Sequence, residues 1–186
     1  MSKIDLSTPN EWQFRDESLG GILFPWYVKS FLDELVTWEL SDKVVFEYGA
    51  GASTVWWAKK ALKVYSVDSS SEWIAAIKKE LIKTWTPGWF KYDDEKESYV
   101  ESAKVCGIKY DIIIIDGEPI EWRDACVQPA LNCLKPGGKL IIDNWMQASV
   151  GWMPREETQR VVTALPHVIY SQEGHPDWKT LVATKQ

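Results

Sequence analysis

The 186-residue sequence predicts an α/β fold: a mostly parallel sheet with helices on both faces and an antiparallel hairpin at its end. Three observations predict it. Apolar runs typical of strands alternate with segments of helical apolar spacing, as expected when helices connect parallel strands. A glycine turn joins the first strand to a helix, and the next strand ends in an acid. The last two strands are joined by a polar link too short for a parallel crossover.

The amino-terminal region is expected to precede the sheet. Residues 1–24 look irregular, because a proline and two adjacent glycines interrupt any apolar pattern. Pro25 suits the first turn of a helix, since its fixed φ angle matches the helix and its missing N–H costs nothing there. Apolar residues at helical spacing then continue this helix to about Leu40.

A strand, a glycine turn and a helix start follow one another after this first helix. Residues 43–48 form an apolar, β-branched and aromatic run, as expected of a buried parallel strand. Gly49 and Gly51 allow a tight turn and leave the backbone open to close approach by a ligand. Ser53 or Thr54 is then expected to cap the following helix.

The rest of the chain alternates between strands and helices. Asp68 ends the second strand about 20 residues after the first turn, the distance at which an acid hydrogen-bonds a ribose. The remaining expected strands are 63–67, 89–92, 110–115, a fifth after the turn 136–138, 167–171 and 178–184. The remaining expected helices are 53–62, 71–83, 98–106, 124–134 and 155–165, two of them capped by Ser71 and Asp124.

Three motifs occupy the middle of the chain in a fixed order. Residues 47–51 read acid, any residue, Gly, any residue, Gly; residues 110–117 form an aliphatic strand ending in Asp116; residues 134–144 read LKPGGKLIIDN. Together they resemble the class I S-adenosylmethionine-dependent methyltransferases, in particular small stand-alone bacterial ones. The resemblance implies a Rossmann-like seven-stranded sheet in the order 3-2-1-4-5-7-6, with the last strand antiparallel.

The resemblance also implies a domain organisation and a cofactor. We expect a single methyltransferase domain over 1–186, with a cap and helix over 1–40 and a cofactor-binding core over 43–186. The cofactor is S-adenosylmethionine. The residues expected to bind it are Glu47, Gly49, Gly51, Ser53, Thr54, Asp68, Ser69 and Asp116.

Each of the main cofactor residues has a role implied by the resemblance and a simpler alternative. Glu47 suits the amino end of the cofactor, whereas a carboxylate would repel a pyrophosphate; the alternative is a strand-to-helix turn without a ligand. Asp68 would accept hydrogen bonds from the ribose hydroxyls; the alternative is a solvated acid that caps the next helix. Ser69 would lie beside the adenine, and Asp116 would face the reacting methyl group.

Methyl transfer requires alignment of the acceptor and, for some acceptors, a base. The catalytic candidates are Asp116 and Asp143, at strand ends on the expected rim, and His175, in the link of the closing hairpin. Asp116, Asp143 and Asn144 also match the acids and the asparagine that hold Mg²⁺ in cation-dependent catechol-type relatives. Those relatives place a lysine after the first acid, where residues 117–119 are Gly-Glu-Pro, so no metal is expected.

Aromatic residues outside these motifs are expected to enclose the methyl acceptor. They are Trp12, Trp26, Trp122, Trp145 and Trp152. Aromatic walls suit a flat, partly apolar small molecule or the face of a sugar, so a small-molecule or glycan acceptor is expected. Arg123 is the cation near the site, and it is expected to pair with an acidic acceptor or to form a surface salt bridge with Glu121 or Asp124.

Charge and composition exclude some partners. A net charge of -6 and a pI near 5.0 disfavour a broad nucleic-acid surface. The three cysteines show no paired spacing, as in a reducing cytosol, and no apolar run is long enough to span a bilayer. We therefore expect a cytoplasmic protein without nucleic-acid or membrane partners. The oligomeric state is left open, a homodimer included.

Two other functions remain as alternatives. An NAD-dependent oxidoreductase would have a third glycine at the position of Thr54, and it would not need the closing hairpin. A non-catalytic module that binds the cofactor is the other alternative, because the sequence offers few bases for catalysis.

Overall fold

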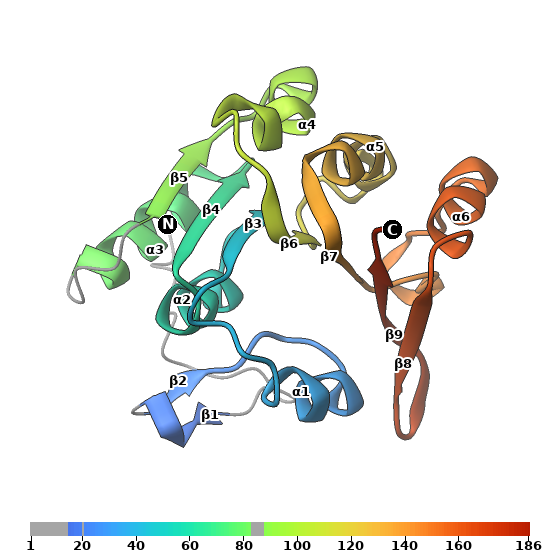
Figure 1. Cartoon of the computed structure of the whole chain (residues 1–186), viewed down its shortest axis with the longest axis horizontal. Coiled ribbons are helices and arrows are strands. Elements are labelled where there is room, and N and C mark those ends of the chain that lie inside the picture. The colour runs from blue at the N-terminus through green and yellow to red at the C-terminus, as the bar shows by residue number, and fades with distance from the viewer. Residues whose placement is uncertain (1–14, 20, 83–87) are drawn as a thin grey trace.

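The computed structural model describes residues 15–19, 21–82 and 88–186 (Figure 1). The expectations for Trp12 and for most of residues 1–24 lie outside the described residues. Within these residues, seven strands form one sheet and two short strands form a second. No helix in the described part of the chain is long and apolar enough to cross a membrane.

The large sheet has the order that the resemblance implied. Its strands are β3 (Val44–Tyr48), β4 (Lys63–Asp68), β5 (Gly88–Tyr92), β6 (Tyr110–Ile115), β7 (Leu134–Asp143), β8 (His167–Gln172) and β9 (His175–Thr184). They are arranged β5-β4-β3-β6-β7-β9-β8. The strands from β5 to β7 are parallel, and β9 runs antiparallel to both of its neighbours. The predicted order 3-2-1-4-5-7-6 is therefore confirmed.

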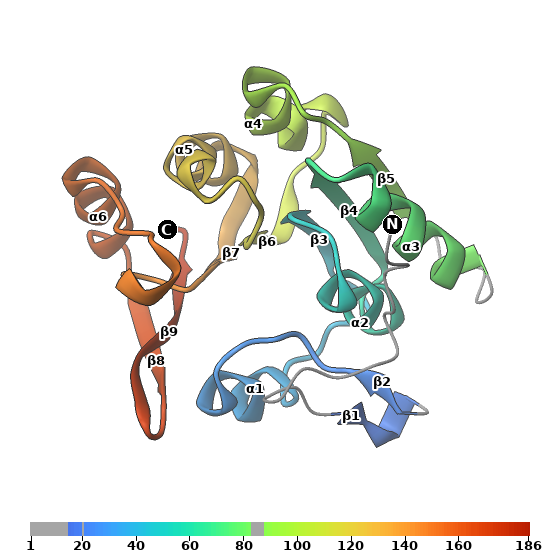
Figure 2. The same ribbon diagram turned by 180° about the vertical axis from the view of Figure 1, so that it is seen from behind.

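Helices cover both faces of this sheet (Figures 1 and 2). One face carries α1 (Lys29–Leu35), α2 (Ala52–Lys60) and α3 (Ser71–Ile82), and the other carries α4 (Lys96–Val105), α5 (Arg123–Cys133) and α6 (Glu156–Thr163). Three short 3₁₀ helices, η1 (Glu17–Leu19), η2 (Ile120–Trp122) and η3 (Ala148–Val150), lie in connections.

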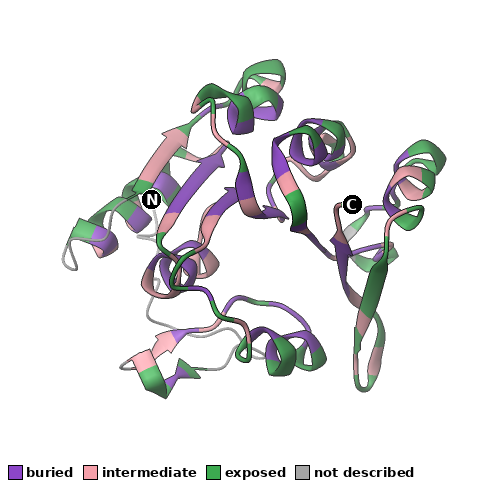
Figure 3. Ribbon diagram, in the orientation of Figure 1, coloured by how far each residue is buried: buried purple, intermediate pink, exposed green. Residues whose placement is uncertain are grey.

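The isoleucine run of β6 shows how the two cores are built. Ile112 and Ile114 pack with α1–α3, whereas Ile113 and Ile115 pack with α4–α6. Successive side chains of a strand point to opposite faces, so a strand covered on both sides has to be apolar throughout. Figure 3 shows the same pattern, with the central strands buried and much of the edge strand β8 exposed.

The first helix is shorter than predicted. α1 begins at Lys29 rather than near Pro25, because Val28 has an extended backbone with ψ near 142°. It ends at Leu35 rather than near Leu40, and the Thr37 hydroxyl donates a hydrogen bond to the Glu34 carbonyl just after this end. Only about two helical turns of the apolar pattern therefore form helix.

Part of the region predicted to be irregular is ordered as strands. β1 (Arg15–Asp16) pairs antiparallel with β2 (Ile22–Leu23). Asp16 is buried, and its carboxylate accepts hydrogen bonds from the Trp56 indole N–H at 2.9 Å and from the Ser18 hydroxyl at 2.5 Å. A buried acid with these partners fixes the hairpin on α2, which local turn signals alone do not predict.

Two predicted caps are wrong by a few residues. Gly51, rather than Ser53 or Thr54, is the N-cap of α2, and its N–H donates to the Thr54 hydroxyl at 3.0 Å. Ser71 is the first residue of α3, and the Ser70 hydroxyl accepts the hydrogen bond from the backbone N–H two residues beyond Ser71. Clusters of serine and threonine offer several caps, and the strand end before the helix decides between them.

Candidate functional site

Acidic residues end the neighbouring central strands at one edge of the sheet. Glu47 is the second-to-last residue of β3, Asp68 ends β4, Asp116 directly follows β6 and Asp143 ends β7. The parallel pairing of these strands places all four at the carboxyl edge, as predicted. The strand order reverses between β3 and β6, the position at which open α/β sheets bind ligands.

Glu47 is held by the start of the next helix. Its side chain is 1% exposed, and its two carboxyl oxygens accept hydrogen bonds from the Ser53 hydroxyl at 2.6 Å and the Thr54 hydroxyl at 2.5 Å. Burial raises the pKa of Glu47 to about 8, although the two hydroxyls oppose this shift. Ser53 and Thr54 thus position the acid, and the Thr54 hydroxyl also accepts the N–H of the N-cap residue Gly51.

The two glycines of the turn differ in whether the fold itself excludes a side chain. Gly49 has φ of 116°, and a Cβ there would lie 3.0 Å from the backbone carbonyl of Asp116, so the fold itself requires glycine. Gly51 has extended backbone, and a Cβ there would meet nothing closer than Trp73 at 3.8 Å. The protein therefore has room for a side chain at Gly51 that the sequence leaves empty.

Asp68 joins the glycine turn to the start of α3. One carboxyl oxygen accepts the Ala50 N–H at 2.7 Å and the other accepts the Ser70 N–H at 2.7 Å. Burial raises the pKa of Asp68 to about 6, and these two bonds oppose the shift. The acid is buried rather than solvated, and each of its oxygens keeps a second lone pair for a ligand hydroxyl.

Ser69 connects two loops of the same edge. Its hydroxyl donates to the Glu118 carbonyl at 2.6 Å, so the connection after β4 is tied to the connection after β6. The Ser69 hydroxyl, which was expected beside the adenine, therefore already donates its proton to Glu118. The residue borders the site mainly through its backbone.

Arg123 is the main element that the sequence analysis misjudged. It is 4% exposed at the start of α5, which excludes the alternative of a surface salt bridge with Glu121 or Asp124. Its guanidinium donates to the Gly117 carbonyl at 2.8 Å and the Asp143 carbonyl at 3.0 Å; it also donates to Asn144 Oδ1 at 3.1 Å and Asp116 Oδ1 at 3.2 Å. It therefore joins the ends of β6 and β7.

Asp124 also differs from its predicted role. It lies in the first turn of α5, and it does not cap this helix. Its carboxyl oxygens accept the Arg155 N–H at 2.9 Å and the Trp152 indole N–H at 3.4 Å. It connects α5 to the segment that leads into α6.

The two acids beside Arg123 have raised pKa values. Burial raises the pKa of Asp116, and the positive charge of Arg123 opposes this. Burial and the negative charge of Asp116 raise the pKa of Asp143, whose Oδ1 accepts the Thr180 hydroxyl at 2.5 Å. The carboxyl edge thus holds four carboxyl groups beside the Arg123 guanidinium, and a further positive charge bound there would lower their raised pKa values.

The Arg123 guanidinium argues against Mg²⁺ at this edge. It hydrogen-bonds Asp116 and Asn144, two of the three residues that would be metal ligands. A cation between them would have to displace another cation, at a cost in charge repulsion. Nor does the part of the chain that the structure describes contain three His, Cys, Asp or Glu side chains grouped to hold a metal.

The connection after β7 has unusual backbone geometry. Asn144 and Met146 have φ of 54° and 57°, which non-glycine residues seldom adopt. Trp145 between them is buried, and its indole N–H finds no partner among the described residues. Trp152 is buried as well, with the Arg123 guanidinium 5.5 Å from its ring. These two tryptophans therefore belong to the core, whereas they were expected to wall an acceptor site.

Tyr27 is a further residue of the site, and the sequence analysis did not single it out. It is buried before α1, and its hydroxyl accepts the Trp57 indole N–H at 3.3 Å. Burial raises its pKa well above the usual range, and the charges of Glu47 and Asp116 raise it further. The aromatic segment around Pro25 was the available signal. The exposed residue there is Trp26, at 50%.

His175 lies apart from the acids along the hairpin. β9 begins at His175 rather than at Trp178, so His175 belongs to a strand and not to the link. Asp143 pairs with Thr180, and His175 lies five residues before Thr180, at the start of β9 beside the turn of the hairpin. Its ring stacks on Trp178 with the centroids 4.6 Å apart.

Comparison with known proteins gives the fold family. No protein-family model and no curated protein matches the sequence. Solved structures do match. RsmC, a T. thermophilus 16S rRNA methyltransferase in complex with AdoMet and guanosine, is 20% identical over 84% of this chain, with a TM-score of 0.62. This chain spans only 41% of RsmC.

Two smaller proteins match over most of their own length. The N-methyltransferase NodS from Bradyrhizobium japonicum, in complex with S-adenosyl-L-homocysteine, is 16% identical over 84% of this chain and 85% of its own, with a TM-score of 0.61. A methyltransferase-like protein from Silicibacter pomeroyi is 17% identical over 87% of this chain and 89% of its own, with a TM-score of 0.63. The chain thus has the fold of the class I S-adenosylmethionine-dependent methyltransferases.

Proposed function

We propose that the protein is an S-adenosylmethionine-dependent methyltransferase. The observation that carries the proposal is the bare backbone at Gly51, between the buried acids Glu47 and Asp68. The fold leaves room there for a Cβ, so the absence of a side chain is best explained by a ligand that passes over the turn. The excess of acid at this edge suits a ligand that carries positive charge.

The residues present fit this cofactor. When bound, it supplies a methyl group on a sulfonium centre. We propose that Glu47 receives its amino group and that Asp68 receives its ribose hydroxyls through the free lone pairs of the carboxylate. Ser53 and Thr54 hold Glu47 in place, Gly49 closes the turn, and Ser69 borders the adenine side.

Acceptor chemistry is assigned to the ends of β6 and β7. Arg123 fixes Asp116, which would orient the acceptor toward the methyl group. The Asp143 carboxyl group accepts the Thr180 hydroxyl, and its raised pKa suits a base that works near neutral pH. His175 takes part only if the hairpin bends back over the edge. No metal is assigned a step, because Arg123 already neutralises Asp116.

We propose a small-molecule or glycan acceptor in the cytoplasm. The net charge of -6 opposes a nucleic-acid surface, and the half-exposed Trp26 offers a flat apolar wall next to the buried Tyr27. The fold does not choose the acceptor, since structures with this fold include an rRNA methyltransferase and a magnesium protoporphyrin IX methyltransferase. The described cysteines Cys106, Cys126 and Cys133 are free thiols, which suits a reducing compartment.

A pair of glycine variants tests the cofactor site. Gly51→Ala should fold with a loss of about 1 kcal/mol or less, because its Cβ has space and only the preference for glycine at the helix N-cap is lost, but it should bind S-adenosylhomocysteine more weakly in calorimetric titration. Gly49→Ala should lose stability by about 1–3 kcal/mol, because it combines a positive φ with a close backbone contact. A Gly51→Ala variant that binds as tightly as wild type would refute the assignment.

The same titration separates the alternatives. Binding of NAD without binding of S-adenosylhomocysteine would favour an oxidoreductase and overturn the proposal. The position of the third glycine of a dinucleotide site is Thr54, whose hydroxyl is engaged by Glu47 and by Gly51. Binding of S-adenosylhomocysteine with no methyl transfer to any acceptor across a metabolite panel would favour a non-catalytic module.

A further inference from the structure

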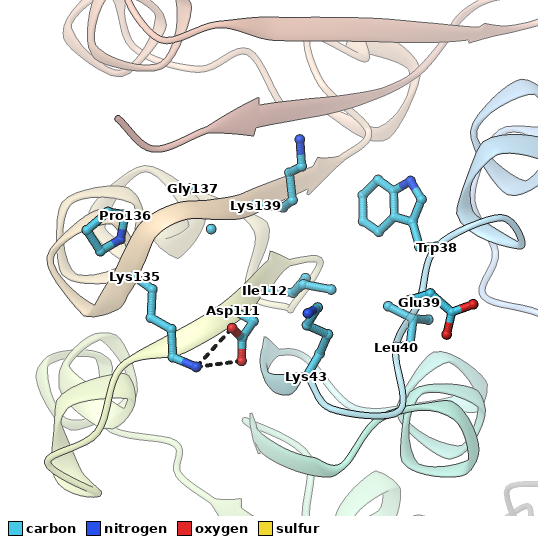
Figure 4. Close-up of a pocket in the computed structure, with 11 residues that line it drawn as sticks. Trp38, Glu39, Leu40, Lys43, Asp111, Ile112, Lys135, Pro136, Gly137 and Lys139 are labelled. Atoms are coloured by element: carbon cyan, nitrogen blue, oxygen red, sulfur yellow. Dashed lines mark hydrogen bonds and ion pairs between the residues drawn. The ribbon is translucent and has the colours of Figure 1, made fainter.

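A cavity lies at the amino-terminal edge of the sheet, opposite the acids of the carboxyl edge. Its volume is about 390 Å³, and it opens between the segment after α1 and the starts of β6 and β7 (Figure 4). Lys139 in its wall and Asp143 at the other end of β7 are separated by four residues, or about 13 Å of strand. The cavity is therefore separate from the proposed cofactor site.

The wall of this cavity combines a flat apolar surface with ammonium groups. The apolar part consists of the Trp38 ring with the buried Leu40 and Ile112. The polar part includes Lys43, Lys135 and Lys139, facing only two acids, Asp111 and Glu39. Asp111 pairs with Lys135, and Asp42, outside the wall, pairs with Lys43, so Lys139 is the lysine of the wall that has no carboxylate partner among the described residues.

The two acids of the wall leave the charge of Lys139 without a partner. Asp111 is already engaged, since both of its oxygens contact the Lys135 ammonium at 2.8–2.9 Å and one also accepts the Val44 N–H at 2.8 Å. Glu39 is exposed, and in Figure 4 its carboxylate points away from the other side chains. Neither acid compensates Lys139.

Lys139 is the group left for an anion. Its ammonium donates to the Thr184 hydroxyl at 2.9 Å and lies 6.0 Å from the centroid of the Trp38 ring, and within the described residues it has no carboxylate partner. Lys43 pairs with Asp42, but the Asp42 side chain is largely exposed, and such a pair contributes little. An anion in the cavity would thus gain a charge-assisted hydrogen bond from Lys139 without breaking a buried ion pair.

We propose that this cavity binds a small planar organic anion. Its carboxylate or phosphate contacts Lys139 and Lys43, and its flat ring lies against Trp38 and Ile112. A cavity of this volume falls within the range of small-ligand pockets. The turn at Gly137 and Gly138 forms the floor, where a Cβ on Gly138 would come within 2.9–3.1 Å of backbone carbonyl oxygens.

The test uses benzoate, adenosine monophosphate and inorganic phosphate as probes. Binding is followed by ligand-detected NMR on the full chain, with S-adenosylhomocysteine present at saturating concentration so that adenine cannot enter the proposed cofactor site. Benzoate or adenosine monophosphate should bind, and the tighter of the two identifies the anion as a carboxylate or a phosphate. Because benzoate does not resemble the cofactor, this arm remains valid if the proposed function fails.

Variants then locate the probe. Lys139→Met keeps the length of the stem and should weaken binding by about tenfold, the value of one charge-assisted hydrogen bond. Lys79→Met, on the exposed face of α3, is the matched control and should bind as wild type does. Trp38→Leu should weaken the ring compounds and leave phosphate unchanged. Thermal unfolding of each variant confirms that it is folded.

Three results would overturn the proposal. The first is that neither ring compound binds the wild-type protein, in which case Lys139 merely covers Trp38 with its aliphatic stem. The second is that a ring compound binds Lys139→Met as tightly as wild type. The third is that inorganic phosphate binds as tightly as the ring compounds, which would remove any role for Trp38.

Discussion

The Arg123 guanidinium holds the ends of β6 and β7 together, an arrangement we call the Arg123 clamp. Removing the guanidinium should therefore cause a large loss of stability. Arg123→Met keeps an unbranched side chain but removes the guanidinium over Trp152 and its hydrogen bonds to Asp116, Asn144 and two backbone carbonyls. Removing one partner of a buried ion pair typically costs about 3–5 kcal/mol. Asp116 is 26% exposed, so water can rehydrate part of its charge, and a value near the lower end, about 3 kcal/mol, is expected.

The measurement is urea unfolding at pH 7 followed by tryptophan fluorescence, with the midpoint and slope fitted for each variant. A loss of this size should also lower the melting temperature by about 6–12 °C for a chain of this length. Arg155→Met is the matched control, because Arg155 is exposed and its hydrogen bonds to Asp124 and Gln159 use its backbone N–H and carbonyl. Its stability should change by less than about 0.5 kcal/mol.

A double-mutant cycle isolates the ion pair from the other bonds. Asp116→Asn is combined with Arg123→Met, and the two changes should interact by about 1–3 kcal/mol, because the acid is costly only when its cation is absent. The reasoning is refuted if Arg123→Met alone costs under about 1 kcal/mol, or if the two substitutions are additive. Either result would mean that solvent, and not the guanidinium, stabilises Asp116.

Two predictions concern the acids of the glycine turn. Burial raises the pKa of Glu47 from 4.5 to about 8, so the folded protein keeps a proton that the unfolded chain has released, and stability should fall as pH rises through this interval. Glu47→Gln should reduce that loss between pH 5.5 and 8 by at least about 1 kcal/mol in urea unfolding; equal slopes for both proteins would contradict it. Asp68→Ala should weaken S-adenosylhomocysteine binding by about 1–3 kcal/mol in calorimetry, with the exposed Asp177→Ala as control, and an unchanged dissociation constant in a folded variant would exclude the ribose role.

The sheet could be predicted because its signals are local. Four consecutive isoleucines can be buried only in a strand covered on both faces, and Asp116 after them has to emerge at the edge. The limits of α1 could not be predicted in this way, because an apolar period continues beyond the residues that contact the sheet. Where the helix begins depends on the extended backbone at Val28, which no apolar period in the sequence reveals.

The role of Arg123 depends on geometry that no spacing reveals. η2 turns the chain between β6 and α5, and this turn directs the first residue of α5 back toward the strand ends. The same composition, one arginine between two acids, would equally describe a solvated helix start. Only the burial of the side chain distinguishes the clamp from a surface ion pair, and burial is a property of the assembled fold.

The glycine motif shows how fold and function can share one sequence pattern. Gly49 is required by the backbone, because a Cβ would meet the Asp116 carbonyl, and any protein with this turn would need it with or without a ligand. Gly51 has no such steric requirement, and the proposed cofactor accounts for the open space beside it. The sequence motif alone does not distinguish the two glycines. The structure makes them opposite controls, one for stability and one for binding, and this is why the pair tests the proposed function more sharply than either substitution alone.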